Sequence, residues 1–267
     1  MIHDFFLYRA AWRYFGASDK EPKLNHKEWK ELLHHGGIMV RNTYDFDRKE
    51  TSSFWYVIKD KCEQNELNTR DRNKVRHAYD AFSYELIKEE TLREKGYAII
   101  KETYEDYRVN DRKMNPKVFE TYLNECNEGH FDYWGIIEKE TRQLVGFCVV
   151  HDWEDCCEYG VTGIRTKYKQ NGTYPYYGLY NAMNQYYLLE KKYKYVSDSA
   201  RTITEHSQIQ SFLIQHFNFR KAYCQLEVHY QWWMKMAVKM LYPFRKIITL
   251  PRIKAVLNME AMQRGEA

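Results

Sequence analysis

The sequence contains no C-x-x-C cysteine motif, although its 267 residues include six cysteines. Zinc sites and dithiol redox sites are commonly built on such motifs, so the sequence supports neither, and we expect no metal site. Cys156 and Cys157 are adjacent, and adjacent side chains on a strand point to opposite faces.

Long apolar runs are also missing. No segment approaches the roughly 20 consecutive apolar residues that cross a membrane as a helix. Residues 1–15 are rich in aromatic side chains, but Asp4, Arg9 and Arg13 interrupt them, unlike the apolar centre of a secretory signal. We therefore expect a cytoplasmic protein whose thiols stay reduced.

Neither sign of charge is in large excess. The formal net charge is +4, and nucleic-acid binding would need Lys and Arg clustered on one surface. One helix candidate carries Arg70, Arg72, Lys74 and Arg76, which are explained more simply as a solvated face. The sequence also shows no nucleophile elbow and no Walker loop.

Apolar and aromatic residues, by contrast, are plentiful. Apolar residues make up 44% of the chain, so a chain of this length can bury a core as one large domain or two small ones. Tyrosine alone accounts for 24 residues. Such a surplus suits a cleft or an interface lined by amphipathic rings, and it also suits an ordinary core.

Hydrophobic periodicity predicts a regular order of elements. We expect residues 1–35 to be mostly helical, followed by two strands and by a helix that starts near Thr69. From Ser83 the expected order is strand, helix, helix, three strands, helix, strand, helix and strand. The second of these helices has Asn115 as its cap and Pro116 at its first position.

The stretch "SQIQSFLIQHFNFRKAYCQLEVHY" changes its period abruptly. Residues 207–217 place apolar side chains on one helical stripe, whereas residues 222–230 alternate as in a strand with one buried face. Between them, Asn218 takes a position that tolerates the left-handed backbone conformation, and Phe219 anchors the turn in the core.

This element order is similar to that of the GNAT superfamily of acyltransferases, over roughly residues 83–230. The Asn218–Phe219 pair resembles the Gly-Phe pair that ends the last helix in that family. The resemblance implies an α/β fold with a mixed, mostly antiparallel GNAT-like sheet, flanked by helices and splayed between two central parallel strands. We accordingly expect an N-terminal helical and hairpin segment at 1–82, a GNAT-like acyltransferase domain at 83–230 and a basic-aromatic helical tail at 231–267.

The resemblance also implies a donor and its position. In the family an acyl thioester, usually acyl-CoA such as acetyl-CoA, enters the splay, which here lies between residues 156–168 and 193–200. Its pantetheine arm bonds to backbone of the first strand, and its pyrophosphate sits at the N-terminus of the next helix. The implied cofactor-binding positions are Ile164, Arg165, Lys169, Tyr177, Gly178 and Leu179.

The sequence departs from the family pattern at three positions. Pro175 stands where the phosphate loop has Arg or Gln, and Tyr180 stands where it ends in Gly or Ala. Ile214 occupies the position of the Tyr that protonates the leaving thiolate in many members. These departures weaken the match to ordinary coenzyme A binding.

Three functions therefore remain open. The first is an N-acyltransferase that moves an acyl group from a thioester, such as acyl-CoA, to the amine of a small molecule or peptide. The second follows from a resemblance to Fem-type aminoacyl and peptidyl transferases, which lack the usual coenzyme A loop, use aminoacyl-tRNA and carry two such lobes; the N-terminal third would be a reduced first lobe. The third is an inactive GNAT-like module used for binding or as a scaffold.

Polar side chains near the expected splay are the candidate site residues. Glu158 on the first splay strand is a candidate base, with Ser199 and Tyr223 as further catalytic candidates. Asp198, Arg201 and His206 are candidates for substrate binding, because they follow the second splay strand. Each also has a structural explanation: a solvated strand residue for Glu158 and Tyr223, a turn for Asp198 and Ser199, an ion pair for Arg201, and a helix cap for His206.

The tail combines aromatic, apolar and basic residues in "QWWMKMAVKMLYPFRKIITLPRIKAVL". Such a helix suits weak contact with an anionic membrane surface. The simpler expectation is a tail that folds back and buries Trp232 and Trp233 against the sheet or against a second subunit of a homodimer, because one apolar stripe does not distinguish lipid from protein.

Overall fold

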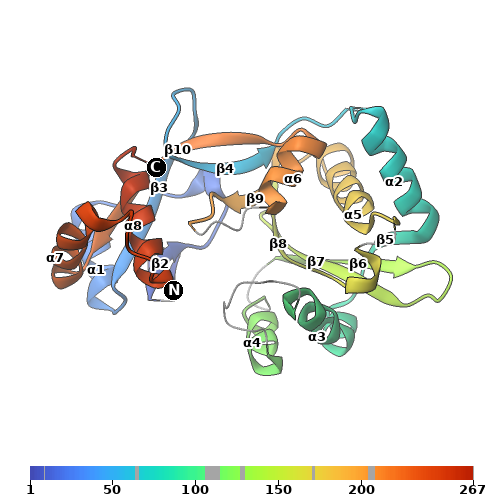
Figure 1. Ribbon diagram of the computed structural model, residues 1–267, viewed down its shortest axis with the longest axis horizontal. Helices are drawn as coiled ribbons and strands as arrows, with labels where there is room; N and C mark the ends of the chain where they lie inside the picture. Colours follow the sequence, from blue (N-terminus) through green and yellow to red (C-terminus); the bar gives the residue numbers. More distant parts are fainter. Residues whose placement is uncertain are drawn as a thin grey trace. The chain divides into compact units, whose positions relative to one another are not determined.

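The computed structural model describes residues 1–8, 10–63, 66–105, 115–126, 130–169, 172–203 and 208–266 (Figure 1). Two compact units share the chain. The terminal unit comprises residues 1–57, 200–211 and 220–267, and the middle unit comprises residues 58–199 and 212–219. Each unit combines residues from separate parts of the chain, whereas the three segments predicted from the sequence are consecutive. The boundaries of those three segments stay a prediction.

The middle unit is built on five neighbouring strands. Their order is β9 (Tyr195–Ala200), β8 (Cys156–Ile164), β7 (Leu144–Asp152), β6 (Phe131–Glu138) and β5 (Phe82–Leu86). The pairs from β5 to β8 are antiparallel, and β8 pairs with β9 in parallel. The last residue of β9 is counted in the terminal unit.

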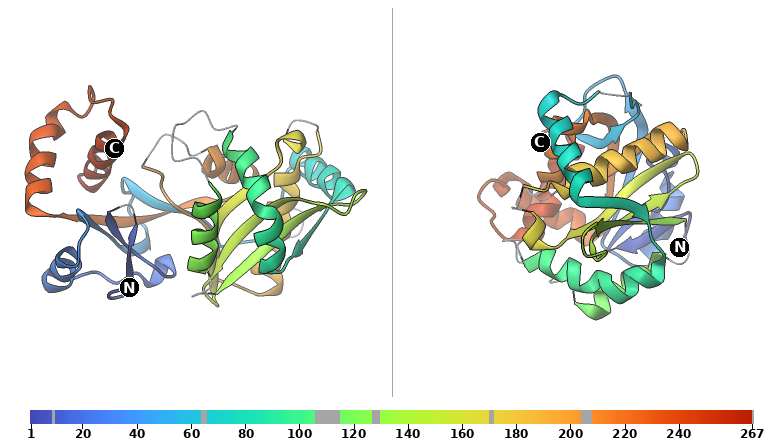
Figure 2. Two further views of the ribbon diagram at one scale, coloured as in Figure 1. Left: turned by 90° about the horizontal axis from the view of Figure 1, so that it is seen from below. Right: turned by 90° about the vertical axis from the view of Figure 1, so that its right-hand side faces the viewer.

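Helices cover both faces of these strands, as Figure 2 shows. On one face lie α3 (Glu89–Glu105) and α4 (Pro116–Cys126), which enclose a core with Leu92, Ile99, Ile100, Phe119, Leu123, Phe147 and Val149. On the other face lie α2 (Thr69–Ala81) and α5 (Pro175–Asn184), which α6 (Gln208–Phe217) accompanies. α5 continues as a π-helix over Gln185–Glu190.

Aromatic rings fill the space under α5. Tyr180 and Tyr187 are almost completely buried, and Tyr159 on β8 lies with ring centroids 5.7 Å from Tyr180 and 6.4 Å from Tyr187. Phe212 and Phe217 of α6 reach Tyr180 at 6.1 Å and 6.2 Å. Part of the tyrosine surplus therefore builds this core.

The terminal unit carries strands in the order β1 (Phe5–Tyr8), β2 (Ala11–Tyr14), β3 (Met39–Arg48), β10 (Arg220–Tyr230) and β4 (Phe54–Lys59). β3 pairs with β2 in parallel and with β10 in antiparallel register. β4 continues into the middle unit at Ile58. The remaining helices are α1 (His26–His34), α7 (Trp232–Leu241) and α8 (Pro251–Gln263), with short 3₁₀ turns at Ser18–Lys20 and Tyr242–Phe244.

The helical prediction is wrong for the first 25 residues. Residues 5–8 and 11–14 form the β1–β2 hairpin, in which Phe5 pairs with Tyr14. Phe5 and Trp12 are buried against Leu32 and Leu33 of α1. Aromatic residues suit strands, and a hairpin lets both rings reach one core from a short segment.

The predicted turn from helix to strand is confirmed. Asn218 follows α6 with a φ of 56°, and Phe219 is buried and donates its backbone N–H to the carbonyl oxygen of Leu213 at 3.3 Å. The next strand then buries Ala222, Cys224, Leu226 and Val228 in alternation. The α/β fold with a mixed, mostly antiparallel sheet and a parallel β8–β9 pair is also confirmed.

Candidate active site

Strands β8 and β9 pair only over their first residues. The pairs are Cys156–Tyr195, Cys157–Val196 and Glu158–Ser197, although β8 continues to Ile164 and β9 to Ala200. A register shift in the β7–β8 pairing lies between Tyr159 and Thr162, and a Cβ on Gly160 would lie 2.9 Å from the carbonyl oxygen of Val149. Such a bulge bends a strand and ends its pairing. The parallel strands therefore part beyond Glu158, as the sequence predicts.

Two carboxyl groups lie where the strands part. Glu158 closes the paired segment of β8, and Asp198 is the first residue of β9 after its last pair. Burial raises the pKa of Asp198 well above its usual value, and the negative charge of Glu158 raises it further. A raised pKa makes a carboxyl group a better proton donor at neutral pH. Because Glu158 is in register with Ser197, the alternation along β9 directs Asp198 to the opposite face of the sheet from Glu158.

The backbone turns sharply directly after Asp198. Ser199 has a φ of 66°, which is uncommon for a residue other than glycine, and its N–H donates to the Ser197 side-chain oxygen at 3.0 Å. Backbone conformations of this kind cost about 1–3 kcal/mol and cluster at functional sites. Ser199 thus shapes the end of β9 next to the carboxyl pair.

The first turn of α5 is occupied by the protein's own side chains. A Cβ on Gly178 would lie only 2.1 Å from the hydroxyl oxygen of Tyr84. Lys74 donates to the hydroxyl oxygen of Tyr177 at 2.6 Å. The Tyr177 N–H donates to the carbonyl oxygen of Tyr174 at 2.9 Å, and Pro175 has no N–H to offer. Leu179 is fully buried.

Ile164 and Arg165 are tied to α3. The Ile164 N–H donates to the Thr103 hydroxyl oxygen at 3.0 Å, and the Arg165 guanidinium pairs with Glu102. Lys169 follows a short 3₁₀ turn and donates its N–H to the carbonyl oxygen of Thr166 at 3.0 Å. The six predicted cofactor positions therefore lie around the end of β8 and the start of α5, and most have bonds within the protein.

Arg201 and Tyr223 meet in the terminal unit, around Trp55. The Arg201 guanidinium lies 4.2 Å from the centre of the Trp55 ring and donates to the carbonyl oxygen of Ser53 at 2.6 Å. Burial lowers the pKa of Arg201. The Tyr223 ring stands edge-on to Trp55 at 6.2 Å, and the Lys221 ammonium lies 4.1 Å from that ring.

The remaining residues singled out in the sequence are His206 and Ile214. His206 lies outside the described residues. Ile214 lies half-buried on α6. Trp55 was not predicted, although the alternation in "SFWYVIKD" places it on the opposite face of β4 from the buried Phe54 and Tyr56.

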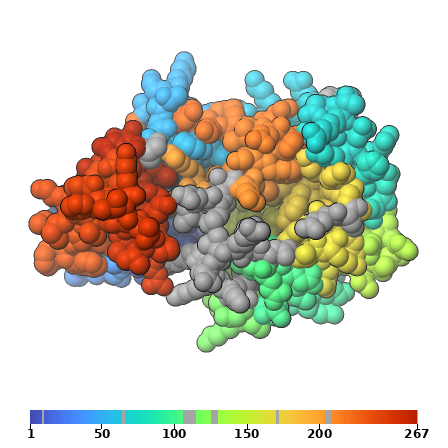
Figure 3. All heavy atoms as spheres, in the orientation of Figure 1, coloured from blue at the N-terminus to red at the C-terminus, as the bar shows by residue number. Residues whose placement is uncertain are grey.

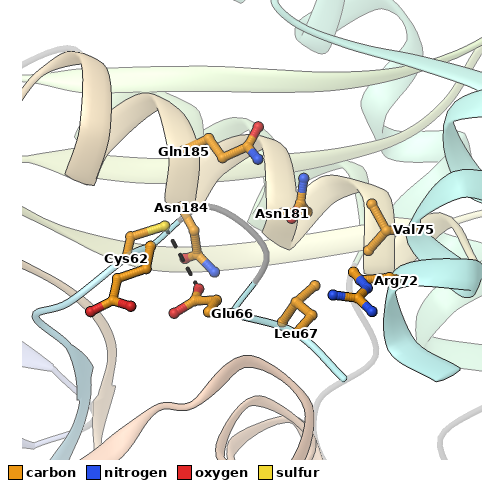
Figure 4. Close-up of a pocket in the computed structure, with 9 residues that line it drawn as sticks. Cys62, Glu66, Leu67, Arg72, Val75, Asn181, Asn184 and Gln185 are labelled. Carbon is orange, nitrogen blue, oxygen red and sulfur yellow. Dashed lines mark hydrogen bonds between the residues drawn. The ribbon is translucent and has the colours of Figure 1, made fainter. Parts of the chain in front are cut away.

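A pocket of about 180 Å³ lies beside the C-terminal half of α5 (Figure 4). It is lined by Cys62, Glu63, Glu66, Leu67, Arg72, Val75, Asn181, Asn184 and Gln185. The buried Asn184 accepts a hydrogen bond from the Tyr159 hydroxyl at 2.9 Å, while its amide nitrogen has no partner. The pocket is smaller than the roughly 300–1,000 Å³ typical of sites for drug-sized ligands.

Within the described ranges, no cluster of three or more His, Cys, Asp or Glu residues has a metal-binding arrangement. In the same ranges, no helix combines the length and the hydropathy needed to cross a bilayer.

Solved structures with the same fold include FemX. It superimposes with a TM-score of 0.51 at 11% identity, over 76% of this chain and 68% of FemX. L-PGS from Bacillus licheniformis matches with a TM-score of 0.46 at 11% identity, over 88% of this chain and 77% of that one. A tandem GNAT protein from the clavulanic acid biosynthesis pathway matches with a TM-score of 0.39 at 12% identity, over 76% of this chain and 66% of that one. At these identities the likeness concerns the fold alone.

No protein-family model and no curated protein matches the sequence. The GNAT-like fold and the resemblance to the Fem type are nevertheless confirmed at the level of structure.

Proposed function

We propose that this protein is an aminoacyltransferase, which moves an aminoacyl group from its ester on tRNA to an amine. The observation that carries the proposal is the carboxyl pair Glu158 and Asp198 at the point where β8 and β9 part. The fold shared with FemX supports a transferase of this kind.

In this proposal the two carboxyl groups supply the proton transfers, one from each face of the sheet where β8 and β9 part. The acceptor amine attacks the ester carbonyl carbon, Glu158 takes a proton from the amine, and a carbon–nitrogen bond forms. The carbon–oxygen bond to the ribose then breaks, and Asp198 gives its proton to the leaving oxygen. Proton transfer by positioned side chains accelerates a reaction by roughly 10²- to 10⁴-fold.

The start of α5 favours this donor over coenzyme A. A pyrophosphate would need free N–H groups and close approach to the backbone there. Gly178 instead faces the Tyr84 hydroxyl, and the Tyr177 N–H is used within the turn. These contacts make acyl-CoA the less favoured donor. It is the competing donor that the test must exclude, and an inactive binding module is the competing function.

The test separates the donors by binding before it asks for chemistry. Thermal unfolding is measured with coenzyme A, acetyl-CoA and a longer acyl-CoA, since a ligand at a hundred times its dissociation constant adds about 2.7 kcal/mol. Charged tRNA, with uncharged tRNA as the control, is then tested for binding and for transfer of a radiolabelled amino acid to peptide amines.

We expect no stabilisation by any coenzyme A species, preferential binding of charged tRNA, and transfer. Stabilisation by acyl-CoA would overturn the proposed donor. Failure to bind either donor would overturn the enzymatic proposal and leave the binding module.

A further inference from the structure

Half of the large exposed apolar side chains in the described chain lie within one short segment. Seven of the fourteen belong to residues 232–250: Trp232, Trp233, Met236, Met240, Phe244, Ile247 and Leu250. We call this set the tail patch. The red residues of the tail occupy a continuous area of the surface in Figure 3.

The four tail-patch residues of α7 lie on its outer side, because the inner side is already packed, and the other three follow the helix. Met234, Val238 and Leu241 form a core with Leu257 and Ala261 of α8. Trp233, Met236 and Met240 follow spacings of three and four residues, which align them on the opposite stripe. α7 therefore has two apolar faces, of which its own unit covers one.

The part of the fold-back prediction that buries these tryptophans against the sheet is wrong. Trp232 is 77% exposed and Trp233 is 48% exposed, so within the described chain neither is buried against the sheet. Contiguous apolar patches of this kind mark surfaces that bind a protein or a membrane. The charge of the segment favours a membrane over a protein partner.

Only one sign of charge occurs along the segment that carries the tail patch. Residues 231–258 contain six basic residues and no Asp or Glu: Lys235, Lys239, Arg245, Lys246, Arg252 and Lys254. Arg245 pairs with Glu266 at 2.8 Å. Lys235 and Lys239 are exposed on α7 itself, beside Met236 and Met240.

We infer that the tail patch binds the surface of an anionic lipid bilayer, with α7 lying in the plane of the interface. Aromatic and aliphatic side chains enter the boundary between headgroups and acyl chains, while lysines beside them face anionic headgroups. A symmetric dimer through the same face would bring Lys235 and Lys239 of both copies into one interface, and lysine is depleted in protein interfaces.

The test uses the full-length protein and flotation with vesicles. One set contains phosphatidylcholine with phosphatidylglycerol, and the other contains phosphatidylcholine alone. We expect flotation with the anionic set only, and loss of flotation at high salt because salt screens the attraction. Each basic residue near such a surface contributes about 1 kcal/mol, so Lys235→Gln/Lys239→Gln should weaken partition roughly thirtyfold.

Matched variants separate the patch from general effects. Trp233→Ser/Met240→Ser should abolish flotation, whereas Leu86→Ser, which changes a side chain 44% exposed elsewhere, should not. Lys95→Gln/Lys117→Gln, on α3 and α4, is the control for charge and should also float normally.

Three results would overturn the inference. They are a protein that stays at the bottom with anionic vesicles at low salt, equal flotation with neutral vesicles, and tail-patch variants that float like the parent. A stable dimer in sedimentation that the Trp233→Ser/Met240→Ser variant dissociates, without vesicle binding, would assign the patch to a second copy.

Discussion

Asp198 shows how one buried residue can carry a chemical role. Asp198→Asn keeps the size of the side chain, but removes the carboxyl proton that the leaving oxygen would receive. We expect the rate of aminoacyl transfer to fall roughly a hundred- to ten-thousand-fold, with a free energy of unfolding close to that of the parent. Single-turnover transfer and urea unfolding measure the two quantities.

Glu158→Gln is the partner variant, and should lower the same rate while leaving donor binding unchanged. Because the two carboxyl groups act in one reaction, the double variant should be no slower than the product of their separate effects. Unchanged transfer in both single variants would remove the acid–base assignment.

Asn218 shows a second kind of residue-scale constraint, in the backbone. Its φ of 56° at the end of α6 is unfavourable for a β-branched side chain. We expect Asn218→Val to destabilise the protein by about 1–2 kcal/mol, whereas Asn218→Gly should be neutral or slightly stabilising. The midpoint of urea unfolding, at unchanged slope, measures the difference. A valine variant as stable as the glycine variant would contradict this account.

At the scale of elements, α2 and α6 are joined by a hydrogen bond between a buried carboxyl group and a histidine ring. The carboxyl group of Asp71 is 1% exposed and lies 3.0 Å from the His216 ring nitrogen. Burial alone would raise the pKa of Asp71, but hydrogen bonds from His216 and Asn68 outweigh it, and the pKa is lowered. The ionised carboxyl therefore stabilises the fold above its usual pKa, and that stability is lost as the pH falls through the folded value.

Removal of His216 should reverse this balance. In His216→Ala, only Asn68 and Lys74 still offset the burial of Asp71, so we expect a loss of about 1–3 kcal/mol at neutral pH and an acid transition at higher pH than in the parent. Urea unfolding between neutral pH and about pH 3 follows both changes. His77→Ala, on the exposed side of α2, is the control. An acid transition that stays in place would show that His216 does not set the pKa of Asp71.

Periodicity predicted the elements from Ser83 to Tyr230 because most of them bury one face against a core in their own neighbourhood. The β1–β2 hairpin escaped prediction, since its strands of four residues each are too short to establish a period and depend on α1 for burial. At the site, the positions of Glu158 and Asp198 followed from strand order. The position of Tyr84 beside Gly178 could not be predicted from the sequence, because the two residues are 94 positions apart (178 − 84).

At the scale of the whole molecule, the two units exchange chain four times. The chain passes between them after Val57, Ser199, Ser211 and Phe219. Neither unit can therefore be obtained by cutting the chain once, and the full chain is the proper material for every experiment proposed above.

The pairing of β3 with β10 has a consequence for synthesis on the ribosome. Arg48 pairs with Tyr223, and Met39 pairs with Tyr230, so β3 must wait for a strand that is made much later. At about 5–20 residues per second, this delay lasts roughly 10–35 seconds. Throughout that interval the nascent chain presents a strand edge open to wrong partners, which makes the emerging N-terminal segment a natural client for a chaperone.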